Sequence, residues 1–130
     1  MTDIDPNAFA REWVDAWNRR DLPAVLARYA DDIRFVSPLA ARVTGNAVVV
    51  GKTALEAYWT AALTRAGDLK FALERPIWDP ERRLLAIVYA RRMNGSYEGA
   101  VEIFHFRKDG LVDSGEAMYG ALASRGVSVA

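Results

Sequence analysis

Residues 83–107 read RLLAIVYARRMNGSYEGAVEIFHFR, and this stretch carries the strongest structural signal in the chain. On each side of Asn94-Gly95, large apolar side chains alternate with other residues at a period of two, which is typical of a half-buried strand. An Asn-Gly pair between two such runs is the sequence that two-residue hairpin turns prefer. The stretch therefore predicts two antiparallel strands, 83–93 and 97–107.

Two further strands extend this hairpin. Residues 69–78 and 111–119 also alternate at a period of two. Asp79-Pro80-Glu81 joins the first of them to the hairpin, and Asp109-Gly110 joins the second; both are strong turn signals. Because short connections make neighbouring strands antiparallel, the C-terminal half is predicted to be a four-stranded meander.

The N-terminal half is predicted to contain three helices. The first runs from 7 to about 19, after the cap and proline of Asp5-Pro6, and Asp21 caps a second, shorter one. The third spans about 53–66, and Thr53 with Glu56 predicts its capping box. The predicted inward stripes are Phe9, Trp13, Ala16 and Trp17, then Leu22, Val25, Leu26 and Tyr29, and last Leu55, Tyr58, Trp59, Ala62 and Leu63.

Between the second and third helices, residues 33–37 predict a short strand that Pro38 ends. Residues 39–50 have no clear period, so we expect a loop with some extended pieces. No repeat or linker divides the chain, which predicts one domain over 1–130, with a core of about 7–120 and a tail at 121–130. Helices followed by an antiparallel meander indicate an α+β fold with the helices on one face of the sheet.

The composition suits one packed domain and argues against several classes of function. Hydrophobic residues make up 52% of the 130, and the absence of cysteine excludes disulfides and thiolate zinc sites. Seventeen basic and seventeen acidic residues cancel, so we expect no nucleic-acid partner. No apolar run approaches the roughly 20 residues of a membrane span, and the acidic N-terminus does not resemble a secretion signal. We therefore expect a cytoplasmic protein with no membrane partner.

One phosphate-binding motif is rejected. Residues 45–53 read GNAVVVGKT, which is close to the P-loop pattern. That loop needs four residues between its glycines, whereas five separate Gly45 from Gly51. Thr53 is better explained as a helix cap, so nucleotide binding is not predicted.

The chain resembles the SnoaL-like members of the nuclear-transport-factor-2-like (NTF2-like) superfamily from about Phe9 to Tyr119. No single motif is specific, but the order and spacing of several segments are. These segments are the aromatic first helix with Trp13, Trp17 and Asn18, the stretch DDIRFVSP at 31–38, Gly51-Lys52 before the third helix, and FHFRKDGLV at 104–112.

The resemblance implies a cystatin-like cone, in which three N-terminal helices pack on a strongly curved mixed or antiparallel sheet around an internal pocket. It also implies a homodimer packed through the sheet, a small apolar molecule as ligand, and no cofactor or metal. The superfamily includes ketosteroid isomerases, polyketide cyclases, limonene epoxide hydrolases, dehydratases and members without catalysis, so the fold does not choose the reaction.

Strand pairing locates a candidate site. The Asn94-Gly95 turn places Arg91 opposite Glu98, Tyr89 opposite Ala100 and Ile87 opposite Glu102. If Phe106 faces Val112 across the next turn, Glu102 lies opposite Glu116 and Ala100 opposite Met118. The predicted pocket face then carries Leu85, Ile87, Tyr89, Arg91, Glu98, Ala100, Glu102, Phe104, Glu116 and Met118. A one-residue slip in that turn would send Glu116 to the opposite face.

Glu102 and Glu116 are the first candidate catalytic residues. Two carboxylates facing each other on an apolar wall raise the pKa of at least one, which suits general acid or base chemistry. The alternative is that Arg91 and Glu98 form an ordinary cross-strand pair and that Glu116 points to water. His105 is a third candidate, but its parity places it with Val101 and Ile103, away from Glu102. The candidate substrate-binding residues are Trp17, Tyr29, Trp59, Tyr89, Arg91 and Met118.

The family's catalytic sets are not met in full. Tyr29 and Glu102 are only loose counterparts of the tyrosine and acids of ketosteroid isomerases, and no arginine–aspartate pair of the epoxide-hydrolase kind is evident. Two functions stay open. The first is an isomerase, cyclase, dehydratase or hydrolase in which a glutamate acts as acid or base on a small apolar cyclic substrate. The second is a non-catalytic ligand-binding or dimeric assembly domain.

Overall fold

The computed structural model describes residues 4–120, which form four helices and one six-stranded sheet. In chain order the elements are α1 (Pro6–Asn18), α2 (Leu22–Leu26), β1 (Tyr29–Val36), α3 (Pro38–Thr44), β2 (Val48–Val50), α4 (Lys52–Arg65), β3 (Leu69–Asp79), β4 (Leu84–Met93), β5 (Ser96–Phe106) and β6 (Val112–Gly120). The strand order is β2-β1-β6-β5-β4-β3, and only β1 and β6 are parallel among neighbouring strands of these residues.

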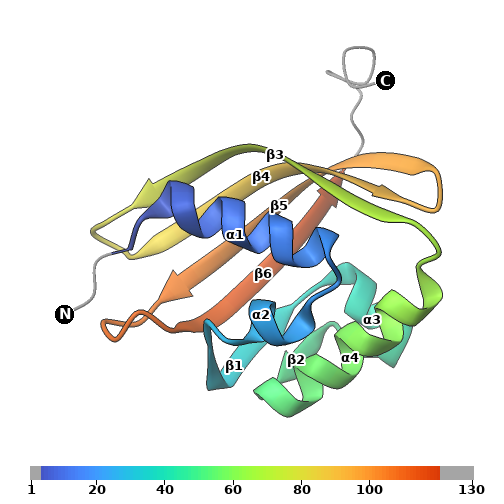
Figure 1. The fold of residues 1–130 in the computed structure, drawn as a ribbon. Helices are drawn as coiled ribbons and strands as arrows, with labels where there is room; N and C mark the ends of the chain where they lie inside the picture. Colours follow the sequence, from blue (N-terminus) through green and yellow to red (C-terminus); the bar gives the residue numbers. More distant parts are fainter. Residues whose placement is uncertain (1–3, 121–130) are drawn as a thin grey trace.

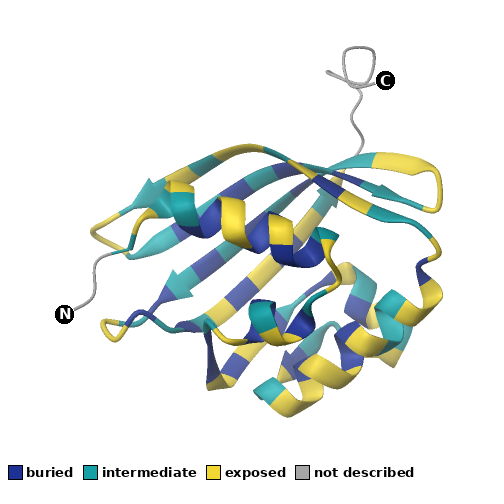
Figure 2. Cartoon of the chain, in the orientation of Figure 1, coloured by how far each residue is buried: buried dark blue, intermediate teal, exposed yellow. Residues whose placement is uncertain are grey.

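The predicted α+β cone is confirmed. Figure 1 shows the sheet curving around the helices, with α1 lying across its long strands and α4 beside β1 and β2. Buried residues alternate with more exposed ones along β4 and β5, and they line the face of α1 that meets the sheet (Figure 2). The predicted tail at 121–130 lies outside the described residues. No helix within 4–120 has the length and apolarity that crossing a membrane requires.

The three predicted helices and the four strands of the meander are confirmed, with bounds close to those expected. Asp5 caps α1 by accepting a hydrogen bond from the amide of Ala8 at 3.0 Å, and Asp21 caps α2 by accepting one from Ala24 at 3.1 Å. Helix α2 ends at Leu26, so Tyr29, predicted on its inward stripe, belongs to β1 instead.

The prediction of a loop over 39–50 was wrong in part, because α3 occupies residues 38–44 and β2 follows it. The local signals for α3 are present. Ser37 accepts a hydrogen bond from the Leu39 amide at 3.1 Å, Pro38 fills the first turn, and Gly45 ends the helix with φ +83°. The helix is short and buries only Ala40, so its apolar period is too weak to detect.

The predicted capping box of α4 was also wrong. Gly51 is the N-cap, at φ +93°, and no side chain caps this helix; Thr53 lies inside it. A positive φ is the backbone conformation that favours glycine, so Gly51 supplies the sharp exit from β2 that a threonine cap would not.

The register of the hairpin is confirmed, with Arg91 opposite Glu98 and Ile87 opposite Glu102. The register of the last strand was wrong beyond its first pair. Phe106 faces Val112 as predicted, but Asp113 is an extra residue in β6, and the pairing resumes one residue later with His105 opposite Ser114. Such a bulge reverses which side chains face the core for the rest of the strand.

Candidate functional site

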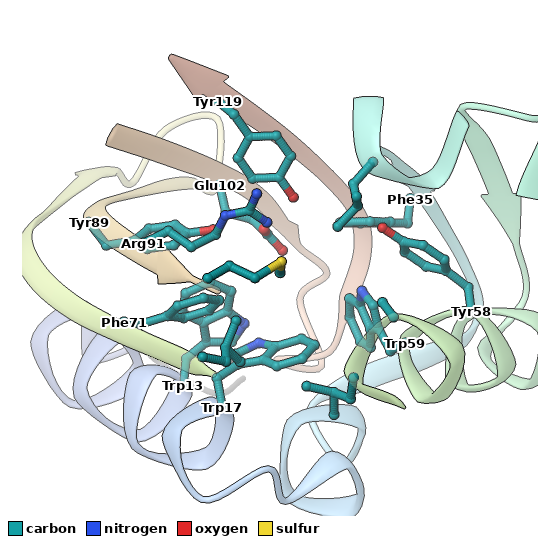
Figure 3. A pocket seen from close by; sticks show the side chains of 15 residues that line it. Trp13, Trp17, Phe35, Tyr58, Trp59, Phe71, Tyr89, Arg91, Glu102 and Tyr119 are labelled. Carbon is teal, nitrogen blue, oxygen red and sulfur yellow. The ribbon is translucent and has the colours of Figure 1, made fainter. Parts of the chain in front are cut away.

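A cavity of about 40 Å³ lies between the curved sheet and the helices. Figure 3 shows two walls that face each other, with Glu102, Arg91, Tyr89 and Phe71 on one side and Phe35, Tyr58 and Trp59 on the other. The indole rings of Trp13 and Trp17 lie below, and Tyr119 lies above. The lining residues are Trp13, Trp17, Phe35, Leu39, Tyr58, Trp59, Ala62, Leu63, Leu69, Phe71, Tyr89, Arg91, Met93, Glu102 and Tyr119.

The aromatic walls are packed against one another. The ring of Trp17 meets that of Trp59 edge-on at 5.0 Å between centroids, and Phe71 meets Tyr89 at 4.7 Å. Asn18 holds this wall to α1, because its side chain accepts a hydrogen bond from the Phe71 amide at 2.7 Å and donates one to the Phe71 carbonyl at 3.0 Å. Such contacts fix the orientation of the rings that a ligand would meet.

Glu102 is the carboxyl group of this cavity. It projects from β5 into the aromatic wall and is 4% exposed. Burial raises its pKa from 4.5 to about 8, and the positive charge of Arg91 opposes only part of that rise. Its Oε2 atom has no hydrogen-bond partner among the described residues. At neutral pH Glu102 is therefore mostly a neutral acid that can either donate a proton or, after losing it, accept one.

Arg91 lies beside Glu102 and is 8% exposed (Figure 3). Its Nη2 donates to Glu98 Oε1 across the hairpin, and the guanidinium lies 4.1 Å from the ring centroid of Tyr119. The Nε–H group of Arg91 has no partner within residues 4–120. The predicted Arg91–Glu98 pair thus forms, but it leaves one guanidinium donor at the cavity.

Two phenol groups close another side of the cavity. The hydroxyls of Tyr58 and Tyr119 are both hydrogen-bonded with Ser37, which is fully buried. Burial raises the pKa of each tyrosine above its ordinary value. Both phenols are therefore neutral at physiological pH and contribute no charge to the site.

The structure brings five of the predicted site residues together at the cavity, namely Trp17, Trp59, Tyr89, Arg91 and Glu102. Tyr29 is buried behind the wall instead. Its hydroxyl accepts a hydrogen bond from Trp13 Nε1 at 3.4 Å, and its ring packs on Trp59. It supports the lining residues without being one of them.

Glu116 and Met118 do not face the cavity, contrary to the prediction. Because of the bulge at Asp113, Glu116 pairs with Ile103 and Met118 with Val101, on the outer face of the sheet. Both are exposed, and Met118 is 44% exposed. The two carboxyl groups predicted to face each other are therefore on opposite faces of the sheet.

His105 also lies on the outer face, as its parity indicated. Its Nδ1 is 2.7 Å from Asp113 Oδ1, and the imidazole is 39% exposed. His105 and Glu102 therefore lie on opposite faces of the sheet. The position agrees with the predicted parity, which placed His105 with Val101 and Ile103 and away from Glu102.

Several lining residues were not predicted as site residues. Tyr119 was missed because the bulge that turns it inward has no clear sequence signal. Tyr58 and Trp13 were assigned to inward helix stripes, but helical spacing alone does not separate a cavity wall from ordinary core. Within residues 4–120, no group of three His, Asp or Glu side chains could hold a metal ion.

The fold and the cavity together define a class of protein, a cone-shaped α+β domain whose aromatic interior holds one buried carboxyl group among the described residues. The chain belongs to the SnoaL-like domain family, whose profile matches residues 10–114. The similar solved structures place this family within the NTF2-like, cystatin-like fold.

Three solved structures illustrate the similarity. A SnoaL-like protein of unknown function from Burkholderia thailandensis is 35% identical with a TM-score of 0.80, covering 89% of this chain and 94% of that one. An NTF2-like protein of unknown function from Burkholderia pseudomallei is 23% identical with a TM-score of 0.76, covering 98% and 100%. TerC, co-crystallised with polyporic acid, is 16% identical with a TM-score of 0.75, covering 97% and 100%. Among curated proteins, none matches the sequence significantly.

Proposed function

We propose that this protein binds a small apolar cyclic molecule in the cavity and that Glu102 exchanges a proton with it. One observation carries the proposal: a carboxyl group that is 4% exposed, with a pKa raised to about 8, lines a cavity walled by aromatic rings. A buried acid without a full set of partners costs stability, and such groups are concentrated at functional sites.

Proton transfer is the chemistry that Glu102 supports best. A general acid or base works best when its pKa lies near the operating pH, and burial moves Glu102 into that range. The reactions that need no more than this are isomerisation, cyclisation, dehydration and hydrolysis. The surrounding rings would hold the substrate and exclude water, which strengthens each electrostatic interaction at the carboxyl. TerC, a protein of the same fold, was crystallised with a small molecule, which supports the ligand part of the proposal.

A second function is non-catalytic binding of the same kind of ligand. The observation that favours it is the position of Glu116. With Glu116 on the outer face, Glu102 is the one carboxyl among the lining residues, so no second acid is present there to complete an acid–base pair. A pocket with a single neutral acid can hold a ligand without transforming it.

A ligand screen followed by turnover assays tests these two functions. The purified protein would be screened by thermal shift against small steroids, terpenoid epoxides, phenols and aromatic polyketide mimics. A compound at 100 times its dissociation constant adds roughly 2.7 kcal/mol to the stability of the folded state. Compounds that bind would then be assayed for conversion with the wild type and Glu102→Gln.

We expect conversion by the wild type and a loss of roughly 100-fold or more in Glu102→Gln, with binding retained. Conversion that survives in Glu102→Gln would contradict the role of Glu102. Binding without any conversion would favour the second function. If no compound in the screen stabilised the protein, both functions would be contradicted.

We also propose that the protein forms a homodimer through the outer face of the sheet. The side chains there on β4 and β5 are small or apolar and only half-buried in one chain, and Met118 adds a large exposed apolar group. A second copy of the same face would cover these groups symmetrically. The residues concerned are Ala86, Val88, Ala90, Val101, Ile103 and Met118.

A further inference from the structure

Three buried polar atoms at the cavity have no hydrogen-bond partner among the described residues. They are Trp17 Nε1, Arg91 Nε and Glu102 Oε2, and each belongs to a lining residue that is less than one-tenth exposed. A buried polar atom that stays unpaired costs about 1–3 kcal/mol. Three of them around one cavity therefore indicate a ligand with a complementary polar group.

The hydrogen-bonding character of these atoms limits what that group can be. The indole Nε1–H and the guanidinium Nε–H can only donate. Glu102 in its neutral form adds an O–H donor. The phenols of Tyr58 and Tyr119 are engaged with Ser37. The group that satisfies these atoms is consequently an acceptor, and an oxygen with several lone pairs can receive more than one of the three bonds.

The charge at the cavity favours an acceptor that is negative. Arg91 and Glu102 are the lining residues that carry or can carry a charge near neutral pH, since Tyr58, Tyr89 and Tyr119 have raised pKa values and stay neutral. With Glu102 protonated, the wall carries the single positive charge of Arg91. Glu98, its ion-pair partner, does not line the cavity and is more exposed than Arg91. Charge-assisted hydrogen bonds from a guanidinium are roughly twice as strong as neutral ones.

The rest of the cavity accepts only an apolar body. The wall facing Arg91 and Glu102 carries the rings of Trp59 and Phe35, which meet edge-on (Figure 3). Flat rings meet such walls in offset or edge-to-face contact. Because a cavity that binds benzene measures about 150 Å³, the side chains around this cavity of about 40 Å³ have to move apart to admit a ring. Arg91 and Glu102 lie together on one side of the cavity and Trp17 lies below them (Figure 3), so the ligand has one polar end and one apolar end.

We infer that the ligand is a small cyclic carboxylic acid that binds as its carboxylate anion. Arg91 Nε and Trp17 Nε1 donate hydrogen bonds to the carboxylate oxygens, and the O–H group of neutral Glu102 donates a third. This inference deepens the proposed function by giving the ligand class for the same cavity, and it rests on that function.

Calorimetric titration with benzoate and benzamide tests the inference directly. The two probes share ring and shape, but only benzoate is an anion that can accept all three bonds. At about pH 6, below the pKa of Glu102, we expect benzoate to bind at least about tenfold more tightly than benzamide. Equal affinity, or tighter binding of benzamide, would overturn the inference while leaving the proposed function intact. If neither these probes nor any neutral apolar compound bound, the proposed function would fail as well.

Two tryptophan variants compare the unpartnered indole at the cavity with an indole outside its lining. Trp17→Phe keeps an aromatic ring and removes the unpartnered donor, so the benzoate-to-benzamide ratio should fall roughly fivefold or more. Trp78→Phe removes an indole that is not among the lining residues and packs on Phe106, and the ratio should stay the same. A ratio that falls equally in both variants would contradict the assignment of Trp17. Circular dichroism would verify that each variant is folded.

The affinity for benzoate should depend on pH, which an effect of packing alone would not produce. As Glu102 ionises above about pH 8, it turns from a donor into a second anion beside the bound carboxylate. Benzoate affinity should therefore fall by roughly tenfold across this range in the wild type. In Glu102→Gln, which stays neutral and keeps an N–H donor, the affinity should change little. A wild-type affinity for benzoate that is constant through pH 8 would contradict the role of Glu102 as a hydrogen-bond donor to the carboxylate.

Discussion

Glu102 combines two properties that normally exclude each other, full burial and an ionisable side chain. Its position follows from the hairpin, because the Asn94-Gly95 turn places it opposite Ile87 on the concave face. Both Asn94 and Gly95 adopt positive φ, at +53° and +83°, as this two-residue turn requires. The sequence therefore predicts where Glu102 points, while the size of its pKa shift depends on residues from other strands and helices.

Burial of Glu102 should make the protein less stable as the pH rises. The folded state holds this proton up to about pH 8, whereas the unfolded chain loses it near 4.5. Between these values the folded state binds more protons, so the free energy of unfolding falls with increasing pH, by roughly 1.4 kcal/mol per unit from this group. Urea unfolding of the wild type and Glu102→Gln across this range should show the difference between them grow in favour of the variant. A difference independent of pH would contradict the raised pKa.

Gly115 lies where a side chain would disturb the core. A Cβ atom there would come 3.1 Å from Cδ1 of Phe35, which is 2% exposed and lines the cavity. Gly115→Ala should therefore lower the free energy of unfolding by about 1–3 kcal/mol. Gly120→Ala, on the same strand with no atom within 4 Å of its added Cβ, is the matched control and should change stability little. Equal effects of the two substitutions in urea unfolding would contradict this account of the packing.

At the scale of the elements, the bulge at Asp113 decides which residues of β6 reach the cavity. It turns Ala117 and Tyr119 inward and Glu116 and Met118 outward. Strict alternation predicts the opposite, since a period of two contains no information about an inserted residue. The hairpin and the meander could be predicted because their turns are local signals, whereas the bulge depends on pairing between β5 and β6.

The connection between α1 and β3 should depend on Asn18. Its side chain makes both hydrogen bonds to the backbone of Phe71, at 2.7 Å and 3.0 Å, across 53 residues of sequence. Asn18→Ala would leave a partly buried N–H and C=O unpaired, so we expect a loss of about 1–3 kcal/mol in stability and weaker ligand binding. Asn46→Ala is the control, because the side chain of Asn46 bonds only the nearby amide of Val48 in an exposed loop. Chemical unfolding of both variants would measure the difference, and a similar loss in both would argue against a special role for Asn18.

At the scale of the whole molecule, the sequence predicts the α+β cone but only part of its site. The Asp5 cap and apolar period specify α1 through local chemistry, and the turn residues specify the meander. Trp17, Trp59, Tyr89, Arg91 and Glu102 line the cavity, on the faces that helical spacing or strand alternation predicts for them. Tyr119 and the outward position of Glu116 come from the bulge, which only the assembled sheet shows.

The proposed homodimer should depend on the outer face. We expect a dimer in light scattering after gel filtration, and Ile103→Glu should convert it to a monomer by adding a charge at the centre of that face. Val50→Glu is the control, because Val50 is 64% exposed on β2, at the edge of the sheet. A wild-type protein that is monomeric at micromolar concentration, or an Ile103→Glu variant that stays dimeric, would contradict the proposed interface.

The central claim is that Glu102 is a neutral, proton-exchanging acid inside the cavity. The most direct test is a carbon-13 NMR titration of the glutamate side-chain carboxyl groups, with Glu102→Gln identifying the resonance of Glu102. A midpoint near pH 8 is predicted, well above the ordinary value of 4.5. A midpoint near 4.5 would show that Glu102 is ionised at neutral pH and would contradict both the acid–base role and the net positive charge proposed for the cavity.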